Sequence, residues 1–211
     1  MTTTTHGSRN RAARLHVIER LALARHATEL LHDKEQALQR ERARLEAHAT
    51  RARSAWIAAA DDAATWLQRA RLLGATDDID VLARRGPGRA GVTIDWQSSM
   101  GIVYPGEVRC EPSEEPDVTS TAALAPTARA HASALVAAAT HAATHAALGR
   151  LDDELARTRR RRRAIGDRLV PRLELELRTL ELELDEQDRE EALRVRLATE
   201  RRSERGPEDR T

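Results

Sequence analysis

Residues 17–73 read VIERLALARHATELLHDKEQALQRERARLEAHATRARSAWIAAADDAATWLQRARLL, without a glycine or a proline. Mostly apolar side chains recur along this stretch in alternating steps of four and three residues. The ladder comprises Val17, Leu21, Ala24, Thr28, Leu31, Glu35, Leu38, Arg42, Leu45, Ala49, Ala52, Trp56, Ala59, Ala63, Trp66, Ala70 and Leu73. A period of 3.5 residues over several heptads is typical of a coiled-coil seam. We therefore predict a helix over residues 11–73, about 95 Å long at the usual rise per residue. Such a helix needs a second helix against which its apolar seam can be buried.

The partner is predicted at residues 126–205, where Pro126 stands at a position that can start a helix. Its seam comprises Leu148, Leu151, Leu155, Ile165, Leu169, Leu173, Leu177, Leu180 and Leu184. The two successive steps of four that follow Leu169 form a stutter, which unwinds a supercoil locally. Because Pro171 lies beside the stutter and favours a kink, we expect the second helix to bend there.

Residues 173–184 alternate leucine with polar side chains and therefore also fit a strand. Leucine, glutamate and arginine are strong helix formers, and Asp185 with Arg189 and Glu190 with Arg194 are well-ordered i,i+4 pairs, so a helix is favoured. The apolar face of this segment is wider than a two-helix seam can cover. Surplus apolar surface indicates a further partner.

The segment between the helices, residues 74–125, is rich in glycine and proline. Gly74 is placed to end the first helix. Val92, Ile94 and Trp96 alternate with polar residues, and a turn at 98–99 would lead into a second strand at 102–104, which predicts a small hairpin.

Two long helices joined by such a segment should fold back antiparallel. The predicted fold class is all-α, a long antiparallel two-helix coiled coil with a small irregular or β-hairpin cap. Residues 1–10 and 206–211 are expected to be a disordered N-terminus and a disordered tail.

Composition excludes several function classes. Among 211 residues phenylalanine is absent and aromatic residues make up 2%, while charged residues reach 33%, which is typical of long helices. A net charge of +1 provides no general attraction for nucleic acid or an acidic membrane. Cys110 is the only cysteine, so an internal disulfide is excluded. Without a signal peptide or an apolar run of about 18 residues, we expect a cytoplasmic protein that is not inserted in the membrane.

No catalytic constellation is visible, so we expect no enzyme, no cofactor and no metal. The sequence contains no glycine-rich phosphate loop, and the chain should therefore not bind ATP itself. His141 and His145 lie one helical turn apart and could both face a metal ion. No third ligand is placed beside them, and histidines on a small alanine-rich packing face are the favoured interpretation.

Two further segments allow more than one interpretation. The run 157–163 holds six arginines, which could contact phosphates, contact an acidic partner surface, or form a solvated face with Asp153 paired to Arg157. The run lacks interleaved aromatic residues, so base stacking is disfavoured. The alanine-rich stretch 132–147 could be a tight helix seam or a docking place for a third element.

Several strings resemble the D subunit of the V/A-type ATPases. They are LALA at 21–24, LLHDKEQAL at 30–38, MGIVYP at 100–105, RRRR at 160–163, LVPRL at 169–173 and LDEQDREE at 184–191. They occur at the beginning, middle and end of the chain, and the proline-centred string with its acidic continuation is the most specific. The chain is similar to a divergent bacterial member of this family.

The resemblance implies a central rotor-stalk subunit that couples ATP hydrolysis or synthesis in a hexamer of A and B subunits to ion transport by the membrane rotor. The implied partners are the A and B subunits, the F subunit and a membrane-rotor adaptor subunit, with no nucleic acid. The protein would then be peripheral to the membrane through the complex. The alternative is an autonomous coiled-coil scaffold or tether without a motor, and a nucleic-acid-binding helical hairpin is a more distant one.

Partner contacts are expected on surface positions of both helices. These are Arg160, Arg161, Pro171, Leu175, Leu182, Arg194, Arg201, Trp56 and Trp66.

Overall fold

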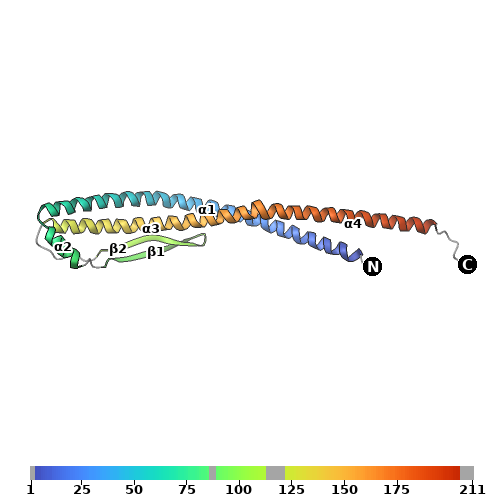
Figure 1. Ribbon diagram of the computed structural model, residues 1–211, viewed down its shortest axis with the longest axis horizontal. Coiled ribbons are helices and arrows are strands. Elements are labelled where there is room, and N and C mark those ends of the chain that lie inside the picture. Colours follow the sequence, from blue (N-terminus) through green and yellow to red (C-terminus); the bar gives the residue numbers. More distant parts are fainter. Residues whose placement is uncertain (1–2, 86–88, 113–121, 205–211) are drawn as a thin grey trace. The chain divides into compact units, whose positions relative to one another are not determined.

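The computed structural model describes residues 3–85, 89–112 and 122–204, and for residues 3–10, 85 and 203–204 it describes the backbone alone. The chain divides into two units. The terminal unit consists of Met1–Asp33 and Arg159–Thr211, and the hairpin unit is the continuous segment Lys34–Thr158. Both are mostly helical, and a small two-stranded sheet belongs to the hairpin unit (Figure 1). The predicted all-α fold with a small hairpin is confirmed.

Helix α1 (Thr3–Leu72) contains the ladder found in the sequence up to Ala70, but Trp56 is 37% exposed, and Leu73 follows the helix and is 64% exposed. The buried members are Val17, Leu21, Ala24, Glu35, Leu38, Leu45, Ala52, Ala63 and Ala70. The helix begins at Thr3 rather than at residue 11, so it includes most of the stretch expected to be disordered. The tail expected at 206–211 lies outside the described residues.

The end of α1 follows the pattern expected from Gly74. Gly74 has a φ of +87°, which L side chains rarely adopt. Its N–H donates to the carbonyl of Arg71 at 3.1 Å, and the N–H of Ala75 donates to the carbonyl of Ala70 at 3.1 Å. These two bonds and the burial of Ala70 and Ala75 in one cluster make a Schellman motif, which satisfies the last carbonyls of the helix.

A short helix that was not predicted from the sequence follows at once. Helix α2 (Thr76–Arg85) has Asp77 and Asp78 in its first turn, where negative charge stabilises a helix. Its Ile79 packs against the cluster of Ala70, Ala75, Ala123 and Leu124. The two acidic residues were the available signal for this helix.

The predicted hairpin is confirmed, but its turn was misplaced. Strands β1 (Gly91–Ser99) and β2 (Ile102–Glu111) pair antiparallel, and Ser99 pairs with Ile102. The connecting residues are Met100 and Gly101, with φ values of 51° and 80°. Tight hairpins favour positive φ at both turn residues because this matches the twist of the strands. Ser98 and Ser99, the predicted turn, belong to β1.

The second long helix is divided into three parts. Helix α3 (Leu124–Arg163) is followed by the π-helix η1 (Ala164–Leu169) and then by helix α4 (Val170–Glu204). The segment 173–184 is helical, so the strand alternative is excluded. The predicted seam was wrong at one position: Leu169 is 36% exposed, whereas Val170 packs against the buried cluster. The bend expected at Pro171 stays a prediction.

Each unit has its own core. In the terminal unit, Val17, Leu21, Ala24 and Leu173 are buried together. In the hairpin unit, Leu45, Tyr104, Ala147 and Leu151 form a cluster with contributions from α1, β2 and α3. In the described part of the chain no helix is long and apolar enough to cross a membrane.

Candidate partner-binding surfaces

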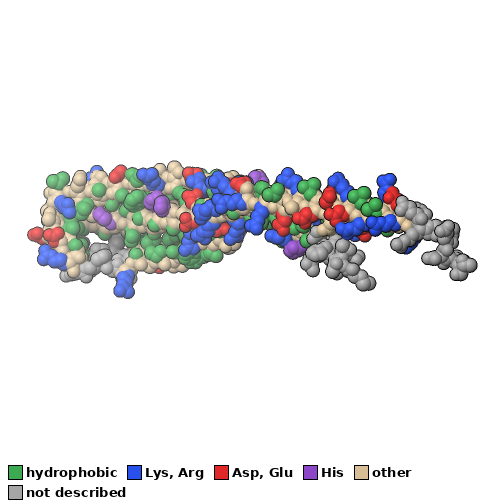
Figure 2. Space-filling view, turned by 45° about the vertical axis from the view of Figure 1, so that its right-hand side comes forward, with side chains coloured by type: hydrophobic (Ala, Val, Ile, Leu, Met, Phe, Trp, Pro, Cys, Tyr) green, Lys and Arg blue, Asp and Glu red, His purple; other side chains and the backbone are tan. Residues whose placement is uncertain are grey.

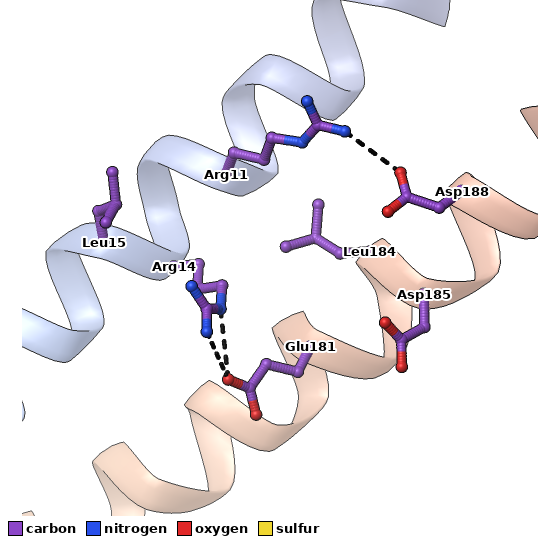
Figure 3. A pocket seen from close by; sticks show the side chains of 7 residues that line it. All are labelled: Arg11, Arg14, Leu15, Glu181, Leu184, Asp185 and Asp188. Atoms are coloured by element: carbon purple, nitrogen blue, oxygen red, sulfur yellow. Dashed lines mark hydrogen bonds and ion pairs between the residues drawn. The ribbon is translucent and has the colours of Figure 1, made fainter.

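Within the terminal unit, ion pairs join the antiparallel helices α1 and α4 (Figure 3). They are Arg11–Asp188 at 3.2 Å, Arg14–Glu181 at 3.0 Å and Arg25–Glu174 at 2.8 Å. Each pair is substantially exposed to solvent, so it contributes little to stability. The three pairs show which residues of the two helices face each other.

A crevice of about 550 Å³ lies among these outer ion pairs. It is lined by Arg11, Arg14, Leu15, Glu181, Leu184, Asp185 and Asp188, and Leu184 projects between the two helices (Figure 3). Leu184 is the last buried residue of α4 among those described. Beyond it, Leu193, Val195 and Leu197 are exposed. The apolar seam thus ends before the helix does.

The predicted contact residues Leu175 and Leu182 lie on the outside of α4. Their side chains are 62% and 71% exposed. At 100° per residue they lie about opposite Leu173 and Leu184, which face α1. Helix α4 therefore carries an inner apolar seam and a separate outer row of leucines. The outer row accounts for the surplus apolar character noted in the sequence.

The arginine run at 157–163 is not uniform. Arg157 pairs with Glu154 at 3.7 Å and not with Asp153 as expected, because the i,i+3 neighbour is closer in this helix. Arg159 and Arg162 also take part in interactions. The predicted contact residues Arg160 and Arg161 are exposed at the end of α3.

Three other predicted contact residues lie on α4. Pro171 is exposed and is the second residue of the helix. Arg194 pairs with Glu190 at 2.8 Å, as predicted, whereas Arg189 pairs with Glu186 at 3.6 Å rather than with Asp185. Arg201 is exposed in the last turn. Along α4, acidic and basic side chains are interspersed on the face drawn in Figure 2, so this helix has no extended region of a single charge there.

Trp56 and Trp66 make their observed contacts with other residues of the hairpin unit. The Trp56 ring stacks on His141 of α3, with ring centroids 5.1 Å apart and an interplanar angle of 13°. Trp66 is covered by the guanidinium of Arg69 at 4.9 Å. The carbonyl of Trp66 accepts a hydrogen bond from the Thr127 hydroxyl at 3.2 Å. The Trp56 ring joins α1 to α3, whereas Trp66 joins them only through its backbone carbonyl, and the role of both toward a partner stays a prediction.

His141 and His145 lie next to each other on α3, and the choice between packing and a metal site stays a prediction. Their rings meet edge to face with centroids 6.2 Å apart. Among the described residues, no group of three or more histidine, cysteine or acidic side chains could hold a metal ion.

The hairpin is attached to α1 through Tyr104, which is 2% exposed. Its hydroxyl donates to Oε1 of Glu41 at 2.7 Å, and Arg44 donates to the same carboxylate at 2.7 and 3.2 Å. The hydrogen bonds from Arg44 and from Tyr104 lower the pKa of Glu41 despite partial burial. Burial and the adjacent carboxylate raise the pKa of Tyr104. This attachment was not predicted, although Tyr104 is the only tyrosine of the chain.

The hairpin is attached to α3 through Arg150. The guanidinium donates to the carbonyl of Val103 at 2.6 Å and lies 5.0 Å from the centre of the Trp96 ring. Between the strands and α3 remains a mostly apolar crevice of about 400 Å³. It is lined by Val92, Ile94, Trp96, Pro105, Val108, Ala139, Ala142, Ala143, Ala146 and Arg150. Part of the alanine-rich stretch thus faces the hairpin, and apolar side chains gather on this part of the surface (Figure 2).

Comparison with known proteins identifies a family. The family model described as the D subunit of ATP synthase matches residues 14–200. This range includes most of α1, the hairpin, and nearly all of the second long helix. No individual curated protein matches the sequence significantly.

Proposed function

The chain belongs to the family of ATP synthase D subunits, and we propose that it is the central rotor-stalk subunit of a V/A-type rotary ATPase. In this role it couples ATP hydrolysis or synthesis in the hexamer of A and B subunits to ion transport by the membrane rotor. It is a structural subunit, and the chemistry takes place in its partners. The complex places it in the cytoplasm, peripheral to the membrane.

The observation that carries the proposal is the extent of the family match. It covers both long helices and the hairpin between them, rather than one helical segment that any coiled coil would resemble. The antiparallel pairing within each unit supports a stalk. A stalk that transmits torque must not slip, and the apolar side chains buried in each seam hold the helices in one register.

The terminal unit is our candidate for contact with the A and B subunits. Its described part consists of helices, and the outer leucines Leu175 and Leu182 are exposed where a surrounding apolar surface would meet them. Arg160 and Arg161 are exposed for an acidic partner surface. A bend at Pro171 would make the stalk eccentric, so that rotation presents different faces to the catalytic interfaces. If ATP turnover in a complex with the Pro171→Ala variant stays coupled to ion transport, eccentricity is excluded as the mechanism.

The hairpin unit is our candidate for contact with the F subunit and the membrane-rotor adaptor. The crevice between the hairpin and the alanines of α3 is apolar and partly open. Trp96 and Arg150 at this crevice supply an aromatic and a cationic group, which are common at protein interfaces.

The experiment is reconstitution with the A and B subunits of the same organism, with and without the F subunit. We expect the wild-type chain to be captured stoichiometrically and to change the rate of ATP hydrolysis. Replacing both outer leucines, Leu175→Asp with Leu182→Asp, should abolish capture without unfolding the chain, because both side chains are exposed. Glu176→Gln, an exposed change on the same helix, is the matched control and should be captured normally.

Two results would contradict the proposal. A folded wild-type chain that does not assemble with A and B subunits would favour the autonomous scaffold. Retention of nucleic acid through purification, with no capture by the subunits, would favour the nucleic-acid hairpin.

A further inference from the structure

The apolar seam of the second long helix takes one step of five residues. Ile165 packs against the core of the terminal unit, and the next residue to do so is Val170, followed by Leu173, Leu177 and Leu180. The step coincides with η1, and the N–H of Val170 donates to the carbonyl of Ile165, a π-helical bond. The wider turn therefore carries one residue more than an α-helical turn would.

The rest of α4 depends on this extra residue. If 164–169 were α-helical without loss of a residue, the positions facing α1 would be Leu169, Arg172, Glu176, Thr179 and Glu183, at steps of four and three from Ile165. That register would bury charged side chains in the seam, which would raise the free energy of the folded state considerably. The observed register buries Leu173 and Leu184 instead. The π-helical turn thus keeps the leucines of α4 on α1.

The turn itself is weakly held. No residue of η1 is buried. Gly166, a poor helix former, lies in it, and the nearest heavy atom that a Cβ at this position would meet is the Thr28 methyl carbon at 3.6 Å. Pro171 follows one residue after Val170 and has no N–H, so one carbonyl of the turn receives no amide hydrogen from it. Fewer hydrogen bonds and little packing make a segment open more readily.

We propose that residues 164–172 are a flexure point, where the second long helix opens before the segments on either side of it. A continuous α-helix could carry the same seam only with one residue fewer, so in this sequence the leucine register is kept through the wider turn, where the helix is held least. The flexure point concerns the chain by itself and does not depend on the rotor role.

The test is amide hydrogen exchange on the full chain, followed by mass spectrometry. We expect amides of 164–172 to exchange about tenfold faster than those of 151–158 and 173–184. Deletion of Gly166 combined with Pro171→Ala restores an α-helical step from Ile165 to Val170, and it should slow exchange to the rate of the flanking segments. Pro171→Ala alone keeps the extra residue, so its exchange should stay faster than that of the flanks.

Equal exchange of 164–172 and both flanks in the wild-type chain would overturn the proposal. So would persistent fast exchange in the combined variant when its helix content matches the wild type by circular dichroism. If the combined variant does not fold, Gly166→Ala decides instead. The added methyl group makes only an ordinary contact with Thr28, and it should slow exchange by several-fold; unchanged exchange would contradict the flexure.

Discussion

The terminal unit and the hairpin unit use the same antiparallel helix pair, but they complete it differently. In the hairpin unit a third element covers the pair, and Tyr104 of β2 is buried with Leu45 and Leu151. In the terminal unit the described helices are joined by a narrow seam flanked by exposed ion pairs, and leucines remain on the outside. A two-helix seam can bury only one stripe of each helix. In the hairpin unit the strands thus cover part of the surface left over by the helix pair, whereas in the terminal unit the outer leucines Leu175 and Leu182 stay exposed.

The largest expected effect is the loss in the free energy of unfolding when a buried leucine is replaced by alanine, and this loss should differ between the two units. Leu151→Ala should lower the free energy of unfolding by about 3–4 kcal/mol, and Leu173→Ala by about 2–3 kcal/mol. Both side chains are 1% exposed, but Leu151 lies in a three-element cluster that closes less easily around a cavity. Urea unfolding followed by circular dichroism measures both. Leu182→Ala, an exposed control, should change the value by less than about 0.5 kcal/mol; an equal loss in all three would contradict the comparison.

The second effect isolates the attachment of the hairpin. Tyr104→Phe keeps the buried ring and removes the hydrogen bond to Glu41. Because this bond is made to a charged group, we expect a loss of about 1–2 kcal/mol in the free energy of unfolding. The same urea titration applies. In a Glu41→Gln background the additional loss should be smaller, and an equal loss there would show that the hydroxyl acts independently of the carboxylate.

The third effect is a pH dependence confined to the hairpin unit. The pKa of Glu41 is lower in the folded chain than its ordinary value of 4.5. Its contribution is therefore fully present above the ordinary value and is lost as the pH falls through the lower folded value. The melting temperature of wild type should exceed that of Glu41→Gln at neutral pH, and the difference should shrink as the pH falls below 4.5. A difference that grows on acidification would contradict this sign.

The smallest effect belongs to the terminal unit. Arg14→Ala removes the pair with Glu181, whose side chains are both about two-fifths exposed. We expect a loss below about 1 kcal/mol that disappears at about 1 M salt, because exposed charges are screened. Thermal unfolding at low and high salt measures it, with the exposed Arg20→Ala as the control. A larger loss of stability that does not change with salt would contradict this expectation, because it would equal the contribution of the Tyr104–Glu41 hydrogen bond.

Much of the fold was predictable because the signals are local. The seam of α1 repeats at one period for its whole length, and Gly74 marks its end by a conformation that other residues avoid. The candidate site was less predictable. The positions of Leu175 and Leu182 on the outside of α4 follow from their spacing, whereas the burial of Tyr104 against Glu41 joins residues of two different elements and has no local signal.

The sequence by itself determined the helical class, the register of α1, the stop at Gly74 and the presence of a hairpin, since each depends on neighbours along the chain. The tertiary structure alone decided that Val170 rather than Leu169 faces the core, and only the folded chain showed that Met100 and Gly101 form the turn and that Arg157 pairs with Glu154. The physical reason is the same for all three. Adjacent positions offer nearly equal local propensity, and small differences in hydrogen bonding and packing select between them.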